Sequence, residues 1–181
     1  MITVVTGNKN KAAEVAAFFK GIAEVEHVSF DTVEPQSESL EEIARAKAGQ
    51  AYKALARPLI VDDTGFFIEA LGGFPGPFAA YVQDTIGNSG ILRLMETESV
   101  RRAYFATVIC YKDAEVCETF CGRVDGEIAK FARGASGFGY DPVFSVNGRT
   151  LAEMDMAEKN TLSHRARALQ EFRKWYISRK C

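Results

Sequence analysis

The sequence predicts one domain in which strands and helices are mixed. In the first half, short apolar runs typical of buried strands alternate with stretches whose apolar residues recur every three or four positions, the period of a helix. In the second half, the apolar runs Arg102–Lys112 and Glu115–Ile128 flank a polar turn and predict an antiparallel hairpin. With 181 residues, 47% of them hydrophobic and 25% charged, the chain can build one domain with its own core and room for two lobes.

The first element is expected to be a strand over Met1–Val5, followed by a polar turn and a helix. The turn, Thr6–Lys11, reads TGNKNK, and the apolar stripe of the helix is formed by Ala12, Val15, Ala16 and Phe19. Backbone N–H groups and the helix dipole favour an anion at a helix N-terminus, and Lys9 and Lys11 add positive charge. The turn is therefore a candidate phosphate site. The alternative is an ordinary capped helix with solvated lysines.

A second strand is expected over Ile22–Phe30, and an acidic segment, Asp31–Glu38, follows it. Ser39 and Glu42 then form a capping-box pattern, in which each side chain satisfies a backbone N–H group of the first helical turn. This pattern predicts a long helix over Leu40–Leu55.

Lys47 lies on the apolar stripe of this helix, seven positions after Leu40. A lysine that faces inward either extends its ammonium group to water or meets an anion. Extension to water is the commoner outcome for a lone lysine. An anionic ligand explains Lys47 better if other anion-binding groups converge on it.

Two acids follow the next apolar run. Pro58–Val61 predicts a strand that ends in Asp62 and Asp63, a frequent place for a metal-binding carboxylate. Adjacent residues of a regular strand point to opposite faces, so only one of the two acids should face any one ligand directly. The alternative is a solvated turn. Further on, Gly72–Pro77 predicts a loop that could act as a mobile lid, and Gly90–Met95 predicts a short helix.

The stretch Ser136–Phe144 reads SGFGYDPVF and leads into a strand over Val143–Val146. Its glycines allow positive φ and the close approach of a ligand. Phe138 and Tyr140 offer flat faces to a flat ligand such as a nucleobase. Asp141 precedes a proline, which biases its backbone to an extended shape that projects the carboxylate. Taken alone, the stretch could equally be a turn that contains aromatic residues.

The chain is expected to end in a helix within Met154–Lys180, with an apolar stripe formed by Leu162, Ala166, Leu169, Phe172 and Tyr176. Lys159, His164 and Arg165 lie near its N-terminus and are candidate ligands of an anion or a base. The alternative for His164 is a surface histidine close to the helix cap.

Composition and cysteine use argue against several classes. The net charge of −2, without a basic patch, argues against a protein that binds duplex nucleic acid. No apolar run approaches the roughly 18 residues of a membrane helix, and the N-terminus lacks a signal-peptide pattern, which predicts a cytoplasmic protein. Without a second Cys or His pair to complete a zinc site, buried or idle thiols are expected at Cys110, Cys117, Cys121 and Cys181.

Six segments, in this order along the chain, resemble the inosine triphosphate pyrophosphatase family: TGNKNK, VEPQSESLEEIARAKA, VDDTGF, GGFPGP, GFGYDPVF and EKNTLSHRARAL. The resemblance extends from Val4 to about Leu169. It implies an elongated α/β fold with a central mixed β-sheet flanked by helices, two lobes with an active-site cleft between them, and a homodimer. It also implies Mg²⁺-dependent hydrolysis of ITP, dITP or XTP to the nucleoside monophosphate and pyrophosphate.

The resemblance assigns residues to the phosphates and the metal. The residues expected at the phosphates are Thr6, Gly7, Asn8, Lys9, Lys11 and Thr64. Lys47 would lie opposite them, which would explain why it faces inward. Glu34 and Asp63 would coordinate Mg²⁺, and Asp63 and Lys47 are the expected catalytic residues.

The resemblance also assigns residues to the base, namely Phe138, Gly139, Tyr140, Asp141, Lys159, His164 and Arg165. Phe138 would stack on the base, and the last three would meet the base edge and the α-phosphate. One departure concerns Phe78–Tyr81, where many relatives carry a serine and this chain has none. A serine hydroxyl contact from this loop is therefore not expected.

Charge explains the expected chemistry. The four negative charges of a triphosphate repel a water nucleophile, and Mg²⁺ with several cationic side chains would neutralise them for in-line attack at the α-phosphorus. Asp63, or Asp62 through a water, could accept the proton. Two alternatives remain: a pyrophosphatase for a pyrimidine or another modified nucleotide, and a nucleotide sensor without catalysis, which would not need the metal carboxylates.

Overall fold

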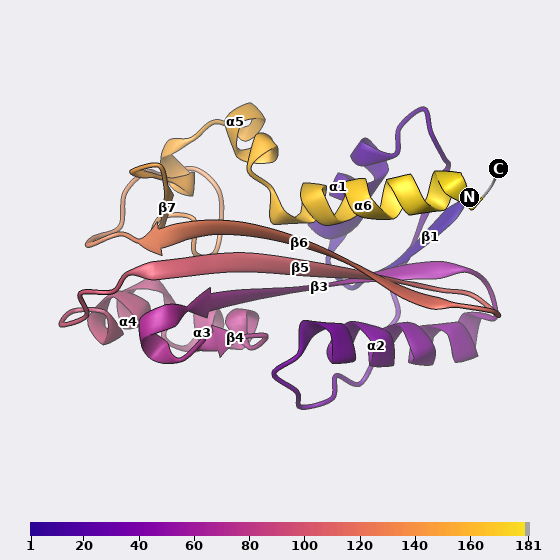
Figure 1. Ribbon diagram of the computed structural model, residues 1–181, viewed down its shortest axis with the longest axis horizontal. Helices are drawn as coiled ribbons and strands as arrows, with labels where there is room; N and C mark the ends of the chain where they lie inside the picture. Colours follow the sequence, from indigo (N-terminus) through magenta and orange to yellow (C-terminus); the bar gives the residue numbers. More distant parts are fainter. Residues whose placement is uncertain (180–181) are drawn as a thin grey trace. The chain divides into compact units, whose positions relative to one another are not determined.

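The computed structural model describes residues 1–179 and includes all their side chains except those of 156, 157 and 160. Its elements, in chain order, are β1 (Ile2–Val5), α1 (Lys9–Phe18), β2 (Val25–Val28), α2 (Leu40–Leu55), β3 (Leu59–Ile68), η1 (Glu69–Leu71), β4 (Pro75–Gly76), α3 (Ala79–Thr85), α4 (Gly87–Leu94), β5 (Arg102–Lys112), β6 (Cys117–Ile128), β7 (Phe144–Val146), β8 (Arg149–Thr150), η2 (Leu151–Glu153), α5 (Met156–Thr161) and α6 (His164–Ser178) (Figure 1). None of the helices in this described part of the chain is long and apolar enough to span a membrane.

The strands form a mixed sheet. Within residues 1–179 it has eight strands, with the order β2-β1-β3-β5-β6-β7-β8 and with β4 paired to β3. β1 pairs in parallel with both β2 and β3, whereas β4, β7 and β8 join by antiparallel pairing. The expected α/β fold with a central mixed sheet flanked by helices is confirmed.

The chain divides into two compact units. The first unit contains Met1–Asp63, Thr107–Gly122 and the chain from Arg165 onward, and the second contains Thr64–Ala106 and Arg123–His164. Three strands, β3, β5 and β6, contribute residues to both units.

The first unit is layered. α2 lies on one side of its strands, and α1 and α6 lie on the other (Figure 1). Val15 of α1 and Phe19, directly after α1, pack with Phe172 of α6 and with strand residues such as Ile60 in one apolar cluster. On the opposite side, α2 buries a stripe of small side chains, Ala44, Ala48 and Ala51, that allows it to approach the sheet closely. This packing places the N-terminus of α1 and the middle of α2 near the part of β3 that belongs to this unit.

The second unit has an aromatic core. Phe66 of β3 lies 4.5 Å from the ring centroids of both Phe105 and Tyr140, and Phe144 packs edge-on against Phe105 at 4.9 Å. Helices α3 and α4 add apolar side chains, including Val82 and Ile91, to the same cluster. Burial of apolar area in such a cluster is the main stabilising contribution to a unit of this size.

Most elements agree with the sequence-based predictions, and α2 begins and ends at the predicted residues. Ser39 is its N-cap and accepts a hydrogen bond from the backbone N–H of Glu42 at 3.3 Å, which is one half of the predicted capping box. The other half is replaced, because the Ser39 N–H donates to Ser37 Oγ at 3.0 Å and Glu42 Oε2 accepts from the Ser37 hydroxyl at 2.7 Å. β2 is shorter than predicted because residues Lys20–Ile22 form a turn in which Gly21 has φ +79°.

Other predictions were wrong. β3 does not end at the acids but continues through Asp62 and Asp63 to Ile68, and both acids are buried, so the solvated turn is also excluded. Ala16 is exposed and does not join the buried stripe of α1. Helix α3 was not predicted, and the predicted loop over Gly72–Pro77 includes the short strand β4. At the end of the chain, α5 and α6 are separate helices, and Leu162 precedes α6.

The cysteines are free thiols in the described part of the chain. Cys110 is buried, Cys117 is half-buried and Cys121 is exposed, while Cys181 and Lys180 lie outside the described residues. No group of three or more His, Cys, Asp or Glu side chains among the described residues could hold a metal ion.

Candidate active site

The turn between β1 and α1 is built as a helix cap. Asn8 is the N-cap of α1, and its Oδ1 accepts hydrogen bonds from the N–H groups of Asn10 at 2.9 Å and Lys11 at 3.3 Å. The N–H of Asn8 in turn donates to Thr6 Oγ1 at 3.1 Å. Gly7, Asn8 and Lys9 are exposed. The cap therefore uses some of the N–H groups expected to meet phosphate, and the turn still presents Gly7 and Lys9 to solvent.

Lys11 and Arg165 both contact Asp62. Lys11 Nζ forms an ion pair with Asp62 Oδ1 and also donates to the Asp62 carbonyl oxygen at 3.2 Å. Arg165 Nε donates to Asp62 Oδ2 at 2.7 Å, and its Nη1 contacts Glu14 Oε2 at 2.7 Å. Burial raises the pKa of Asp62, but the charges of Lys11 and Arg165 outweigh it and hold the pKa well below its ordinary value. Asp62 is therefore a fixed anion: Oδ2 accepts a hydrogen bond from Arg165, and Oδ1, which has no hydrogen-bond partner among the described residues, lies in the ion pair with Lys11.

Asp63 has a different set of partners. Lys47 Nζ reaches from α2 to Asp63 Oδ1 at 2.9 Å and to Glu34 Oε1 at 2.6 Å. The inward orientation of Lys47 is thus confirmed, and in this structure its anions are two carboxylates. The predicted opposite orientation of Asp62 and Asp63 is also confirmed, because one contacts residues of α1 and α6 and the other contacts a residue of α2.

Lys47, Asp63 and Glu34 form a cluster of one amine and two acids, and the pKa values of Lys47 and Asp63 are both raised. Burial raises the pKa of Asp63, partly opposed by the charge of Lys47. Burial lowers the pKa of Lys47, but Asp63 and Glu34 outweigh it and the pKa is raised overall. An excess of negative charge at a half-buried place favours the arrival of a further cation.

The same residues fit a Mg²⁺ ion. Asp63 Oδ2 is buried and has no hydrogen-bond partner among the described residues. An unpaired buried carboxylate oxygen is costly unless something binds it. Mg²⁺ is usually held by one or two carboxylates together with substrate phosphates and waters. Glu34 and Asp63 supply that number of carboxylates, on either side of Lys47.

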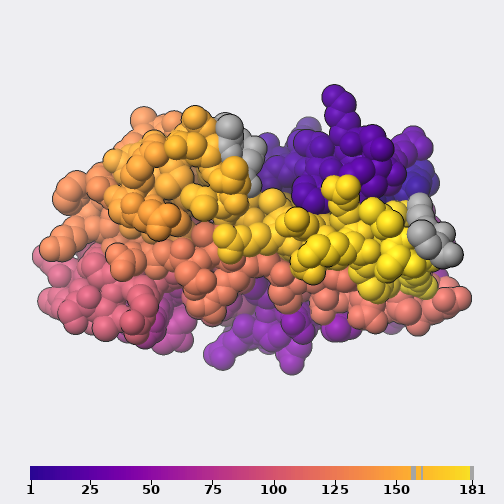
Figure 2. Space-filling view, turned by 45° about the horizontal axis from the view of Figure 1, so that its top comes forward, coloured from indigo at the N-terminus to yellow at the C-terminus, as the bar shows by residue number. Residues whose placement is uncertain are grey.

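The aromatic loop, Ser136–Asp141, lies in the second unit and presents Phe138 to solvent. Phe138 is 67% exposed, and the segment that carries it is part of the orange surface in Figure 2. Asp141 Oδ2 accepts a hydrogen bond from the Phe138 N–H at 2.8 Å and forms an ion pair with Lys159. Lys159 Nζ also lies 4.9 Å from the centroid of the Phe138 ring, within the range of a cation–π contact. The buried Asp141 carboxylate thus holds the Phe138 backbone and the Lys159 ammonium group in place.

Gly137 is required by this arrangement. Its φ is +80°, in the left-handed region, and a Cβ atom there would lie 2.1 Å from Asp141 Oδ2. Any larger residue would push the carboxylate away from Phe138 and Lys159.

The structure places Tyr140 in the core. It is 5% exposed, its hydroxyl donates to the Ala79 carbonyl oxygen at 2.7 Å, and its ring packs on Phe66. Burial and the charge of Asp84 raise the pKa of Tyr140 to about 12, so the hydroxyl remains a donor. Tyr140 therefore anchors the loop and does not offer a second flat face. His164, at the start of α6, stacks on Phe105 with the ring centroids 5.2 Å apart.

Two residues at these sites were not found from the sequence. Glu14 contacts Arg165, and Asn88 Nδ2 donates to the Gly139 carbonyl oxygen at 2.9 Å. Neither belongs to a recognisable motif, and each contacts a residue more than fifty positions away. No local pattern could have indicated them.

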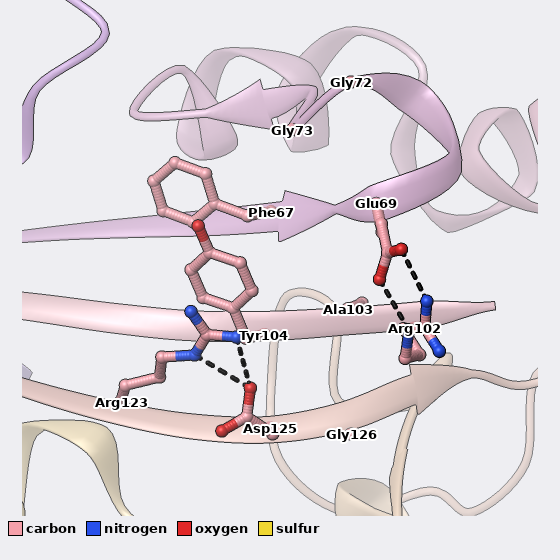
Figure 3. Close-up of a pocket in the computed structure, with 10 residues that line it drawn as sticks. All are labelled: Phe67, Glu69, Gly72, Gly73, Arg102, Ala103, Tyr104, Arg123, Asp125 and Gly126. Atoms are coloured by element: carbon pink, nitrogen blue, oxygen red, sulfur yellow. Dashed lines mark hydrogen bonds and ion pairs between the residues drawn. The ribbon is translucent and has the colours of Figure 1, made fainter. Parts of the chain in front are cut away.

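A hollow of about 440 Å³ on the second unit contains none of the predicted site residues. In Figure 3 the rings of Phe67 and Tyr104 are stacked with centroids 4.7 Å apart, and the Arg123 guanidinium carbon lies 3.5 Å from the Tyr104 ring centroid. Glu69 and Arg102 form an ion pair at 2.6 Å across the hollow from this stack. The acids already pair with the arginines, as expected for a solvated sheet face.

The matches to known proteins cover both the residues around Asp62 and Asp63 and the aromatic loop. The sequence profile of the Ham1 family matches residues 2–175. The chain belongs to the Ham1 family. The match extends from β1 into α6, so it includes the turn before α1, both acids of β3 and the aromatic loop.

Ham1 relatives are similar over almost their whole length. The chain is 47% identical over 174 residues to a dITP/XTP pyrophosphatase of Saccharolobus solfataricus, covering 94% of this chain and 91% of the relative. It is 44% identical over 172 residues to inosine triphosphate pyrophosphatase 1 of Trypanosoma cruzi, covering 93% and 88%. The solved structure of a HAM1 protein from Coxiella burnetii has a TM-score of 0.89 at 31% identity and covers 98% of each chain. The predicted family resemblance is confirmed.

Proposed function

We propose that the chain hydrolyses non-standard purine nucleoside triphosphates, namely ITP, dITP and XTP, to the nucleoside monophosphate and pyrophosphate. The names of its Ham1 relatives, dITP/XTP pyrophosphatase and inosine triphosphate pyrophosphatase, support the substrate class. The observation that carries the chemistry is the unpaired Oδ2 of Asp63, buried beside Lys47 and Glu34. A nucleotide sensor would have no use for a buried carboxylate oxygen held without a partner.

Glu34 and Asp63 would hold Mg²⁺, which when bound supplies charge neutralisation at the phosphates. Lys47 Nζ would then be released from the two carboxylates and would donate to phosphate oxygens. Lys9 is exposed at the turn before α1 and makes no ion pair with other described residues, so its charge is available to the same anion. These residues would position the α-phosphorus for in-line attack by water.

Asp63 is a better acceptor for the proton of the attacking water than Asp62. Both oxygens of Asp62 lie in ion pairs with Lys11 and Arg165, although Oδ1 has no hydrogen-bond partner, whereas Oδ2 of Asp63 has neither an ion pair nor a hydrogen-bond partner among the described residues. Lys11 and Arg165 would contribute their positive charge to the phosphate site while remaining on Asp62.

Base choice would depend mainly on residues of the second unit, with Arg165 contributed by the first unit. Phe138 would stack on any purine, since every base has a flat face. Hypoxanthine and xanthine carry a 6-oxo acceptor, whereas adenine carries an amino donor there, and guanine adds a 2-amino donor. Donors from Lys159, His164 and Arg165 would therefore favour ITP and XTP over ATP and GTP, because a buried donor that faces another donor costs about 1–3 kcal/mol.

The resemblance also supports a homodimer that works in the cytoplasm without binding a polynucleotide. The molar mass in solution tests the first of these: a dimer has twice the 19.9 kDa of the chain, and a monomeric mass would contradict it.

The deciding experiment measures kcat/KM with ITP, dITP, XTP, GTP, ATP and a pyrimidine triphosphate, with separate detection of pyrophosphate and orthophosphate. We expect pyrophosphate as the first product and a clear preference for ITP and XTP. Orthophosphate as the first product from ITP would contradict the assignment. A preference for a pyrimidine would favour the alternative substrate class, and binding without turnover would favour a sensor.

Variants in the same assay test the roles at the base. Phe138→Ala should raise KM for ITP and for GTP alike. His164→Ala should instead lower the ratio of kcat/KM for ITP to kcat/KM for GTP. Phe131→Ala is the matched control, because Phe131 is a similarly exposed aromatic residue outside the aromatic loop. If the wild type has equal kcat/KM for ITP and GTP, the proposal that donors at the base edge select ITP is contradicted.

A further inference from the structure

Two hydrogen bonds connect the aromatic loop to helices α3 and α4. Tyr140 donates its hydroxyl proton to the carbonyl oxygen of Ala79, the first residue of α3. Asn88, in the first turn of α4, donates from Nδ2 to the Gly139 carbonyl oxygen at 2.9 Å. These two contacts fix consecutive residues of the loop, next to the exposed ring of Phe138.

The orientation of the Asn88 amide follows from its partner. A carbonyl oxygen can only accept, so the NH₂ group of Asn88 must face Gly139. Oδ1 of Asn88 is then buried without a hydrogen-bond partner among the described residues. The amide therefore has a role that depends on its donor.

Gly139 needs such a contact. Its φ is +60°, in the left-handed region, and a Cβ atom there would have no heavy atom within 4 Å, so the space on that side of its backbone is open. Glycine samples both signs of φ readily. A hydrogen bond to its carbonyl group selects one conformation and thereby sets the direction of the chain on both sides, including Phe138.

We infer that Asn88 is a positioning residue for purine selection: through Gly139 it holds the Phe138 ring in the orientation in which a base stacks on it. Asn88 does not touch the substrate. This inference rests on the proposed function, because it takes Phe138 as the base-stacking residue.

The first test follows backbone order and does not depend on activity. Hydrogen–deuterium exchange is measured at the amides of residues 136–141 in wild type, Asn88→Ala and Asn88→Asp. We expect faster exchange in this loop in both variants and unchanged exchange in β5 and β6. The control is Ser89→Ala, the next residue of α4, whose hydroxyl donates to Ile86 and not to the loop. Loop exchange equal to wild type in both Asn88 variants would overturn the inference, as would a uniform rise over the whole chain.

The second test is kinetic. Loss of one neutral hydrogen bond corresponds to a change of about two- to tenfold, so Asn88→Ala should raise KM for ITP by that factor with little change in kcat. Asn88→Asp has nearly the same shape but places a carboxylate oxygen against a carbonyl oxygen, so its KM should rise more. Ser89→Ala should keep the wild-type KM.

The outcomes separate this inference from the proposed function. An unchanged KM in both Asn88 variants would overturn the positioning role even if the wild type hydrolyses ITP. A wild type that does not hydrolyse ITP would overturn the proposed function and the purine half of the inference, while the exchange experiment would still decide whether Asn88 orders the loop.

Discussion

Asp62 and Asp63 are neighbours in β3 with different partners, and this difference has consequences at the scale of single residues. Asp62 neutralises Lys11 and Arg165 inside the first unit. Asp63 shares Lys47 with Glu34, and its Oδ2 has no hydrogen-bond partner in the part of the chain that the structure describes. We therefore expect the two acids to differ in whether their loss affects stability or activity.

Asp63→Asn should keep the fold and lose activity. The amide has the shape of the acid but cannot neutralise a metal ion or accept a proton, and loss of such a group costs about a hundredfold or more in kcat. The measurement is kcat for pyrophosphate release from ITP, with the urea unfolding midpoint as a check on the fold. A wild-type kcat in a folded variant would place the essential acid elsewhere.

Asp62→Ala should mainly destabilise the protein. Removing one partner of a buried ion pair leaves the other charge poorly compensated and typically costs about 3–5 kcal/mol. Arg165 is buried here, and Glu14, a second acid with which it forms an ion pair, is far more exposed than Asp62. The free energy of unfolding in urea measures this. The comparison is Glu14→Ala, which removes the more exposed partner of Arg165 and should cost much less. Equal losses in the two variants would show that Asp62 is not the main counter-charge.

At the scale of elements, the aromatic loop depends on a backbone conformation as much as on its side chains. Gly137 has φ +80° and lies against Asp141, and Gly148 has φ +81° in open space. The two glycines therefore separate backbone strain from steric conflict.

Gly137→Ala should weaken substrate binding, whereas Gly148→Ala should not. Both changes carry the strain of positive φ, about 1–2 kcal/mol for a residue with a Cβ atom. Only Gly137→Ala also displaces the Asp141 carboxylate that holds Phe138 and Lys159. We expect KM for ITP to rise by about fivefold or more in Gly137→Ala and to stay near wild type in Gly148→Ala. The same rise in both variants would indicate a general loss of stability.

At the scale of the whole molecule, the metal should be needed for turnover and not for folding. Lys47 forms ion pairs with both Glu34 and Asp63, so the protein itself supplies a counter-charge to these acids, and neither apolar core includes them. A chelator should therefore abolish activity while the unfolding free energy stays within about 1 kcal/mol of that with Mg²⁺, apart from the stabilisation by binding itself.

In Lys47→Ala, unlike in the wild type, the free energy of unfolding should depend on Mg²⁺. Without the ammonium group, the described cation that still acts on the buried Asp63 carboxylate is Lys11, which forms its ion pair with Asp62. In chelator we therefore expect a loss of about 1–3 kcal/mol, part of which Mg²⁺ should restore. The measurement is urea unfolding of both proteins with chelator and with Mg²⁺. Equal metal dependence in wild type and Lys47→Ala would show that the metal binds away from this cluster.

The sequence by itself determined the features that depend on contacts between residues close together in the chain. The capping box and the helical period placed α2 at Leu40–Leu55 and directed Lys47 inward, because a helix is specified by contacts within one or two turns. The six ordered segments were enough to recognise the family, since together they are far more specific than any one alone. The alternation of strand residues predicted that Asp62 and Asp63 would point apart.

Only the tertiary structure decided which acid faces which cation. Asp62 meets Arg165 from 103 positions away, and Asn88 meets Gly139 from 51 positions away. Tyr140, which the sequence placed at the base, is turned into the core by its contact with Ala79, 61 positions away. The periodicity of a strand tells which residues share a face, but the identity of what covers that face depends on the path of the whole chain.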